Sequence, residues 1–480
     1  MKPTMKDIKA NNNALSSPND SFANRQNTNH PKVSCSDGQG TNQPDIHPEN
    51  VKPFDWSIFD GHDWSYLLSH QPQFADKCDW GKFKESNDYS NARERIFIPA
   101  RHDWPELLTY QPQFADKCDK WASFRGDIWV ELLVKRPQFA DKCNWTLFDG
   151  GDWSWLLSEQ PQFAYKCDWT IFKGGDWSKL LSAQPQFANK CDWAKLDSEN
   201  WAELLGKQPQ FADICDKWAS FSGWDWSKLL SAQPQFADKC DWAKLDSENW
   251  ADLLGKQPQF ADICDKWASF DAYHWMWLLI KQPQFADKCD KWASFSGRDW
   301  AKLLAKQPQF ADKCDIWTNF DGTDWVALLS EQPQFADKCD NWTKLSVGYN
   351  IKRCIDDWRM DFAIGNWAFL LSTQPQFADK CDWESLDGYD WARLLVEQPK
   401  FADRCNDWRL LDDDKYYPHR IGMDEFDGSP PEFETTCWSI LLAKRSEFVD
   451  KCDITKLYKD DWVLILSAQP QLLAKCYPSA

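Results

Sequence analysis

The chain has 480 residues, with 74 acidic and 55 basic side chains and a formal net charge of −19. This acidic balance argues against a surface that follows nucleic-acid phosphates, so we expect no nucleic-acid partner. Length alone would allow about three domains. However, 33 Trp and 30 Phe supply ample apolar material for a core, and a short internal repeat overrides the estimate from length.

The N-terminal segment, residues 1 to about 50, is rich in Asn, Ser, Pro, Gln and Asp and almost lacks aromatic residues. Such a segment cannot bury enough apolar surface to offset its ordering entropy, so we predict that it is disordered. It also lacks the apolar run of a signal peptide, and no stretch approaches the ~18 apolar residues of a membrane span. We therefore expect a cytoplasmic protein with no transmembrane segment.

Residues 51–480 are built from repeats of the phrase QPQFADKCDW, which occurs unchanged at 71–80, 233–242 and 374–383. Its cysteine marks fifteen repeats, most of them 24 or 25 residues apart. The marker cysteines are Cys78, Cys118, Cys143, Cys167, Cys191, Cys215, Cys240, Cys264, Cys289, Cys314, Cys339, Cys381, Cys405, Cys452 and Cys476. Three longer intervals indicate insertions near 81–100, 343–366 and 409–436.

The unit DWSWLLSEQPQFAYKCDWTIFKGG, residues 152–175, shows what each repeat should build. Asp152 has the character of a helix N-cap, so we predict a helix that starts there. Trp153, Leu156 and Leu157 have the i, i+3, i+4 spacing of one apolar helical stripe. Pro161 ends this first helix after about two turns and can begin a second one.

The second half of the unit predicts another short helix and a turn. Phe163, Ala164 and Cys167 would lie on the inner side of the second helix, with the thiol as a small packing residue. Trp169 and Phe172 are three apart, which indicates a single helical or 3₁₀ turn. The alternative is a short strand at this DWxxF segment, which would give a mixed α/β solenoid.

The sequence therefore predicts an all-α solenoid of fifteen repeats of ~24 residues, because one short repeat cannot bury its own core and must stack on its neighbours. The alternative architecture is the α/β solenoid. The last units are atypical, with Ile454 and Tyr477 near the usual Trp position. This predicts a straight or superhelical array with capped ends.

The motif WxxLLxxQPQFADKCDW resembles that of uncharacterised bacterial tandem-repeat proteins with the same phrase, and the resemblance covers residues 56–477 outside the insertions. That family implies no activity. The period and the proline-started second helix are also similar to leucine-rich variant repeats, whose fold alternates α- and 3₁₀-helices in a superhelix. The Val-Arg and Asn-Pro positions of that family are absent or altered here.

We expect no metal, no cofactor and no enzymatic activity. One thiol per repeat would place successive sulfurs about 10 Å apart, beyond disulfide or shared zinc geometry. Loops such as Asp149–Asp152 lack the ligand pattern of a calcium loop. The seven His residues form no HxxxH or HExxH pair, and neither a P-loop nor a GxSxG motif is present.

The function we predict is an extended surface for protein–protein interaction. The variable positions between the fixed ones, such as Ser65 and Tyr66 or Val326 and Ala327, and the three insertions are the expected contact sites. The candidate surface residues are Tyr66, Trp155, Trp224, Met276, Trp277 and Trp358. Because exposed indoles also stack on sugar rings, the alternative is a carbohydrate-binding or adhesin-like protein.

Overall fold

A computed structural model describes residues 53–84, 103–346, 349–352, 362–412 and 435–477 of the chain. The chain divides into two units, Met1–Asn50 and Val51–Ala480, and all described residues belong to the second unit. The N-terminal segment predicted to be disordered lies outside the described residues, and so do large parts of the three predicted insertions.

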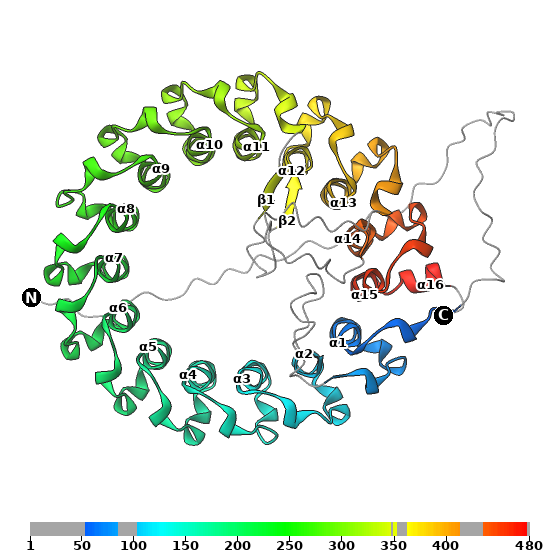
Figure 1. The fold of residues 1–480 in the computed structure, drawn as a ribbon, viewed down its shortest axis with the longest axis horizontal. Coiled ribbons are helices and arrows are strands. Elements are labelled where there is room, and N and C mark those ends of the chain that lie inside the picture. Colours follow the sequence, from blue (N-terminus) through cyan, green and yellow to red (C-terminus); the bar gives the residue numbers. More distant parts are fainter. Residues whose placement is uncertain (1–52, 85–102, 347–348, 353–361, 413–434, 478–480) are drawn as a thin grey trace, which may run out of the picture. The chain divides into compact units, whose positions relative to one another are not determined.

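Each repeat contributes one short α-helix, and these helices are the main elements of the fold (Figure 1). Their bounds are α1 Gly61–His70, α2 Asp103–Tyr110, α3 Gly126–Lys135, α4 Gly150–Glu159, α5 Gly174–Ala183, α6 Ser198–Lys207, α7 Gly223–Ala232, α8 Ser247–Lys256, α9 Ala272–Lys281, α10 Gly297–Lys306, α11 Gly322–Glu331, α12 Asn366–Thr373, α13 Gly388–Glu397, α14 Cys437–Lys444 and α15 Lys459–Ala468. The short helix α16, Leu472–Cys476, completes the last repeat.

Two 3₁₀-helices accompany each α-helix except α15, which is followed by α16. The first kind covers the QPQF segment: η3 Pro72–Asp76, η5 Pro112–Lys117, η7 Pro137–Phe139, η9 Pro161–Lys166, η11 Pro185–Lys190, η13 Pro209–Ile214, η15 Pro234–Lys239, η17 Pro258–Phe260, η19 Pro283–Lys288, η21 Pro308–Lys313, η23 Pro333–Lys338, η25 Pro375–Lys380, η27 Pro399–Arg404 and η30 Ser446–Lys451. The second kind covers the DWxxF segment: η2 Trp56–Ile58, η4 Trp80–Lys82, η6 Trp121–Ser123, η8 Trp145–Leu147, η10 Trp169–Ile171, η12 Trp193–Lys195, η14 Trp218–Ser220, η16 Trp242–Lys244, η18 Trp267–Ser269, η20 Trp292–Ser294, η22 Trp317–Asn319, η24 Trp342–Ser346, η26 Trp383–Ser385, η28 Trp408–Asp412 and η31 Ile454–Lys456.

This pattern confirms the all-α solenoid and contradicts the strand alternative. In the described repeats the DWxxF segment forms a 3₁₀ turn, because an Asp or Asn before it often caps the turn, as Asp168 does by accepting from the Thr170 amide at 3.0 Å. The predicted second helix is also 3₁₀ in all repeats but the last. Its bonds span three residues, as from the Phe163 amide to the Gln160 carbonyl at 3.2 Å, a geometry suited to so short a segment.

The predicted start of the α-helix was wrong by three residues. Helix α4 begins at Gly150, and Asp149 is its N-cap. Asp152 is the third helical residue of a capping box, because its carboxylate accepts from the Asp149 amide at 3.0 Å while the Asp149 carboxylate accepts from the Asp152 amide at 2.9 Å. The two acids of the DGGD loop therefore satisfy each other's backbone N–H groups.

A small antiparallel hairpin, which the sequence did not predict, lies within the second insertion. Strand β1, Tyr349–Lys352, pairs with β2, Phe362–Gly365, in a register that places Tyr349 opposite Gly365. The hairpin leads directly into α12 and contacts α11, α12 and α13. The described part of this insertion is therefore attached to the repeat helices.

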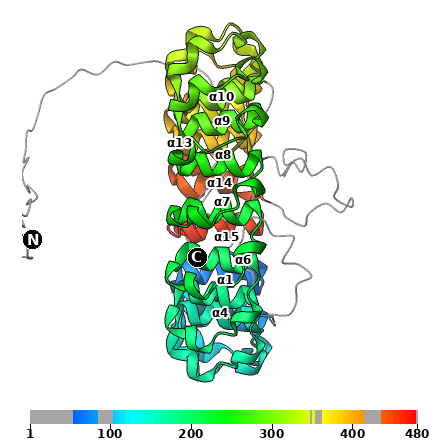
Figure 2. The ribbon, with the colours of Figure 1, turned by 90° about the vertical axis from the view of Figure 1, so that its left-hand side faces the viewer.

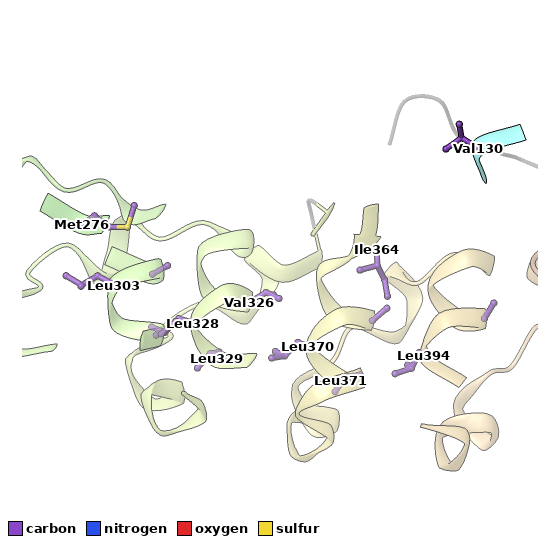
Figure 3. Packing of buried hydrophobic residues seen from close by; sticks show 14 of the residues in the cluster. Val130, Met276, Leu303, Val326, Leu328, Leu329, Ile364, Leu370, Leu371 and Leu394 are labelled. Atoms are coloured by element: carbon purple, nitrogen blue, oxygen red, sulfur yellow. The ribbon is translucent and has the colours of Figure 1, made fainter. Parts of the chain in front are cut away.

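The core of each repeat is aromatic. Trp145, at the end of the third repeat, stacks on Trp153 of the fourth, with ring centroids 5.5 Å apart and an interplanar angle of 13°, and it also contacts Phe163 at 5.4 Å. Trp153 is buried, as are Leu156 and Leu157 behind it. Figure 3 shows the same leucine pair in α11 and α12, where these side chains lie among the buried residues of successive helices. Stacked aromatic pairs and leucines therefore form one continuous core.

One polar contact recurs at every junction between repeats. The first Gln of QPQF donates its side-chain amide to the backbone carbonyl of the penultimate α-helical residue in the preceding repeat, and Arg136 and Arg445 replace it in two repeats. The bond occurs fifteen times, at 2.6–3.2 Å, with Gln160 to Val134 at 2.7 Å as an example. It satisfies a carbonyl at the helix C-terminus that has no partner within its own helix.

The array is closed, and the predicted open array with capped ends was wrong. Helix α1 contacts α15 as well as α2, so the fifteen helices form a ring within the second unit (Figure 1). Gln71 makes the junction bond to the Ser467 carbonyl at 2.6 Å, and Phe54 contacts the rings of Trp462 and Tyr477 at 5.4 and 5.3 Å. Figure 2 shows the ring from its edge as a band of parallel helices.

Candidate functional site

The α-helices lie on the inner side of the ring and the 3₁₀-helices on the outer side (Figure 1). Helix positions are counted as in α4, from Gly150 at position 1 to Glu159 at position 10, with the buried Trp at position 4 in every helix, so that the buried Leu residues occupy positions 7 and 8. Positions 2, 6 and 10 lie on the opposite side of the helix, since 3.6 residues make one turn. We call the side chains at positions 2, 6 and 10 of α1–α15 the inner surface.

The inner surface is open to solvent. Position 10 is exposed in all fifteen helices, and position 6 is exposed or half-exposed in all of them. At position 2, Asp460 of α15 is buried, whereas Trp224 of α7 and Tyr273 of α9 are 53% and 56% exposed. The described part of the chain therefore presents a nearly continuous row of accessible side chains around the ring.

The sequence predicted contact positions in adjacent pairs, such as Ser65 and Tyr66, and only the second residue of each pair belongs to the inner surface. Position 5 faces the next helix, as shown by the Ser65 hydroxyl, which donates to the Asp103 carbonyl at 2.6 Å. Ser65 and Val326 are therefore buried. Met276 was predicted as a surface residue, but it occupies position 5, has no exposed surface and lies among the buried core residues (Figure 3). It packs the junction and cannot contact a partner.

The other predicted residues reach the inner surface at separate places. Trp155 in α4 and Trp277 in α9 are 40% and 42% exposed at position 6, Trp224 in α7 is exposed at position 2, and Tyr66 in α1 is half-exposed at position 6. Trp358 lies outside the described residues. The structure thus distributes these side chains around the ring and does not gather them into one site.

Two further aromatic groups were missed from the sequence. Tyr273 contacts Trp277 edge-on, with ring centroids 6.3 Å apart; it occupies position 2, which the predicted helix start placed outside the helix. Tyr110, 51% exposed, stacks near His70 at 6.4 Å, and Lys135 lies over its ring at 5.7 Å. The repeat alignment could have found Tyr273, because Trp224 and Tyr389 occupy the same position in other repeats, whereas no other repeat has Trp or Tyr at the position of Tyr110.

Charge on the inner surface is mixed. Glu199 and Glu203 of α6 precede Lys207, and Glu248 and Asp252 of α8 precede Lys256. Acids near the helix N-terminus and Lys near its C-terminus both interact favourably with the helix dipole. Much of this charge therefore stabilises the individual helices.

The repeat cysteines contribute to packing and are not activated thiols. Those in the described residues are free and buried or half-buried. Burial raises the pKa of the thiols of Cys78, Cys143 and Cys381 to about 12. Since the thiolate is the nucleophile and the metal ligand, these thiols are poorly suited to either role near neutral pH.

Two buried carboxylates also have perturbed pKa values. Burial raises the pKa of Asp390 to about 6 and that of Asp461 to about 7. Each accepts a backbone N–H from the preceding repeat, Asp390 from Gly365 at 2.7 Å and Asp461 from Thr436 at 2.8 Å. These carboxylates lie at helix position 3, and they hold neighbouring repeats together.

Within the described ranges, no group of three or more His, Cys, Asp or Glu side chains is placed to hold a metal ion. No helix among the described residues is both long and apolar enough to cross a bilayer. In comparisons with known proteins, no family model, no curated relative and no solved structure matches this chain.

Proposed function

We propose that the protein is a non-enzymatic scaffold whose inner surface binds another protein. The observation that carries this proposal is a difference between two exposed positions of the repeat. Position 6 of the α-helix carries ten residue types in fifteen repeats: Tyr66, Glu106, Glu131, Trp155, Lys179, Glu203, Lys228, Asp252, Trp277, Lys302, Ala327, Phe369, Arg393, Ile440 and Leu464.

The outer side of the ring provides the contrast. The exposed position after Phe-Ala in QPQFAD is Asp in twelve of the fifteen repeats, with Tyr165, Asn189 and Ala474 as the exceptions. Solvent exposure alone would allow both positions to vary. The variety at position 6 is therefore consistent with a surface that meets a different group of a partner at each repeat, as in other repeat proteins with concave binding surfaces.

The chemistry of the inner surface favours a protein partner. Lys and Glu side chains are interspersed with Trp and Tyr, whereas a nucleic-acid groove requires a sustained run of basic residues. We place this function in the cytoplasm of a bacterial cell, in line with the reduced thiols and with the resemblance of the repeat motif to bacterial tandem-repeat proteins.

The proposal is tested by affinity capture with two matched triple variants. The inner variant replaces Trp155, Trp224 and Trp277 by Ala, and the outer variant replaces the comparably exposed Ile58, Ile171 and Ile214 by Ala. Circular dichroism confirms that both fold. We expect the inner variant alone to lose the captured partner, and a loss confined to the outer variant would overturn the proposal.

Carbohydrate binding is the second candidate. The exposures of Trp155, Trp224 and Trp277, between 40% and 53%, leave indole faces that could stack on sugar rings. Titration with soluble glycans while tryptophan emission is monitored separates the two functions. A saturable emission change that is absent from the inner variant would support an adhesin-like role.

A further inference from the structure

Two adjacent helices depart from the mixed charge of the inner surface. The inner-surface residues of α9 are Tyr273, Trp277 and Lys281, and those of α10 are Arg298, Lys302 and Lys306. These six side chains comprise four cations, two aromatic rings and no acid, although the chain as a whole carries a net charge of −19. We call this group the α9–α10 patch.

The helix dipole does not account for the patch. Lysines in the last turn are expected, but Arg298 lies in the first turn of α10, where a cation is unfavourable. At the equivalent position α6 carries Glu199 and α8 carries Glu248. The local stability of α10 would thus favour an acid at residue 298, whereas the arginine there interacts electrostatically with the Asp324 carboxylate of α11 and remains exposed on the inner surface.

Two of the four cations in the patch have no acidic partner among the described residues. Lys306 pairs with Glu331 at 2.8 Å and the charge of Arg298 acts on the Asp324 carboxylate of α11, but Lys281 and Lys302 form no ion pair with any described residue. Lys281, Arg298 and Lys302 are all exposed, and so are the rings of Tyr273 and Trp277. The patch therefore combines available cations with an accessible aromatic pair.

The spacing of the cations matches an extended peptide. Arg298, Lys302 and Lys306 are four residues apart on α10, which separates them by about 6 Å along the helix axis. In an extended peptide, alternate side chains on one face are about 6.6 Å apart. Acidic residues at alternate positions of such a peptide would meet successive cations, and a neighbouring apolar side chain would lie against Trp277.

We propose that the α9–α10 patch binds an extended acidic segment of a partner protein, with Asp or Glu at alternate positions. This inference rests on the proposed protein-binding function and names the partner chemistry for one part of the inner surface. A long polyanion fits less well, because acids return on α8 and α11, as in Asp252 and Glu331, on both sides of the patch. A short acidic segment would meet only the favourable part.

The probe is a fluorescein-labelled nine-residue peptide with Glu at four alternate positions, one Leu and otherwise Ser. It is added to the full chain at low salt, and binding is followed by fluorescence anisotropy. We expect saturable binding that weakens at least tenfold when Gln replaces Glu, and that weakens further as salt is raised. Equal binding of the Glu and Gln peptides would overturn the proposal.

Matched variants locate the binding site. Lys302→Glu and Trp277→Ala should each weaken binding of the Glu peptide at least fivefold. Lys179→Glu and Trp155→Ala change the same residue types at position 6 of α5 and α4, outside the patch, and should leave binding within twofold. If the two sets of variants behave alike, the peptide binds elsewhere and the patch is not its site.

Two further probes separate the partner classes. The probes are heparin and an oligothymidine. If either binds more tightly than the Glu peptide, and if Lys302→Glu abolishes that binding, the partner of the patch is a polyanion and the acidic-peptide proposal is overturned. A negative peptide result, together with partner capture that still depends on Trp155, Trp224 and Trp277, would overturn this inference and leave the protein-binding function intact. Capture that is insensitive to the inner surface would overturn the proposed function itself.

Discussion

The side-chain amide of Gln71 donates to the backbone carbonyl of Ser467, 396 residues further along the chain, at 2.6 Å. The same bond joins each of the other fourteen pairs of neighbouring repeats. The first and last repeats therefore meet in the way that covalently adjacent repeats do. Closure removes the two exposed apolar ends that an open array would have to cap.

The closing junction also contains an ion pair, which makes its stability depend on salt. Lys459 lies 3.0 Å from both Asp60 and Asp63, and the Asp63 side chain is fully buried. We expect Lys459→Met to lower the free energy of unfolding by roughly 1–3 kcal/mol, because it removes the cation that faces a buried carboxylate. Urea denaturation at low and high salt measures the change.

The matched control is Lys256→Met, which breaks the exposed Lys256–Asp252 pair within α8. An exposed pair of this kind contributes about 0.3–0.5 kcal/mol. Equal losses in the two variants would show that closure does not depend on Lys459.

The ring should tolerate new chain ends. Phe54 and Tyr477 lie at the two ends of the ring, with their ring centroids 5.3 Å apart. We expect a circular permutant that joins residue 477 to residue 54 by a short Gly-Ser linker, with new ends in the insertion at 409–436, to keep the melting temperature within a few degrees. Far-UV circular dichroism and small-angle scattering check its fold and dimensions.

The control permutant lacks residues 54–59 and thus the DWxxF turn of the closing junction. It should be less stable and more expanded, because Trp56 then no longer stacks on Trp64 at 5.7 Å. If both permutants have the same radius of gyration as the native chain, closure through this turn would be refuted.

The repeat, its period and its helical character could be predicted from the sequence because local signals determine them. Proline at the start of η9 and the stripe of Trp153, Leu156 and Leu157 in α4 require only neighbouring residues. The helix start was misplaced because Asp149 and Asp152 are both good capping residues. Only the reciprocal bonds of the capping box show which of the two is the N-cap.

Closure could not be derived from one repeat, since it depends on curvature summed over all of them. A signal was nevertheless present at the ends of the chain. Residues 55–59, DWSIF, precede the first α-helix, while Cys476 is followed by Tyr477 and Pro478 in place of a DWxxF turn. The N-terminal turn supplies the element that the last repeat lacks.

The candidate surface could be predicted only in part, because Met276 and Trp277 are adjacent in sequence and only the helix start determines which of them is buried.

A glycine at helix position 1 lets a backbone carbonyl of the following turn approach the helix closely, as at Gly223 in α7. Lys244 donates from its Nζ to the carbonyls of Ala219 and Phe221, at 2.8 and 2.7 Å. The backbone carbonyl of Lys244 lies so close to α7 that a Cβ on Gly223 would lie 2.2 Å from it, and the Leu410 carbonyl approaches Gly388 in the same way without a lysine. We expect Gly223→Ala to cost about 1–3 kcal/mol of folding stability, measured by urea denaturation.

Gly206 provides the opposite case. It lies in the last turn of α6, and a Cβ there would meet only the Ala232 methyl, at 3.8 Å. Since alanine is the better helix former, Gly206→Ala should stabilise the protein by about 0.5–1 kcal/mol. A gain in both variants would contradict the close approach at Gly223.

The buried thiols predict slow alkylation and a loss of stability at high pH. Burial raises the pKa of Cys143 and Cys381 to about 12, whereas an unfolded thiol has a pKa of ~8.5. The folded state therefore binds these protons more tightly. Its stabilisation is complete below about pH 8.5 and is lost as the pH rises toward 12. We use a chain in which Cys35, Cys354 and Cys437, the three cysteines that are not the marker cysteine of a repeat, are replaced by Ser.

In that chain, iodoacetamide at pH 8.5 should modify the repeat cysteines at least tenfold more slowly in buffer than in urea, as measured by peptide mass spectrometry. The free energy of unfolding should fall between pH 9 and 11, by up to ~1.4 kcal/mol per pH unit for each thiol that ionises only on unfolding. Cys143→Ala should reduce this slope, whereas Ser158→Ala, a half-buried substitution without a titrating group, should not. Rapid labelling of Cys143 in the folded chain would show that its thiol is accessible and would contradict its role in the core.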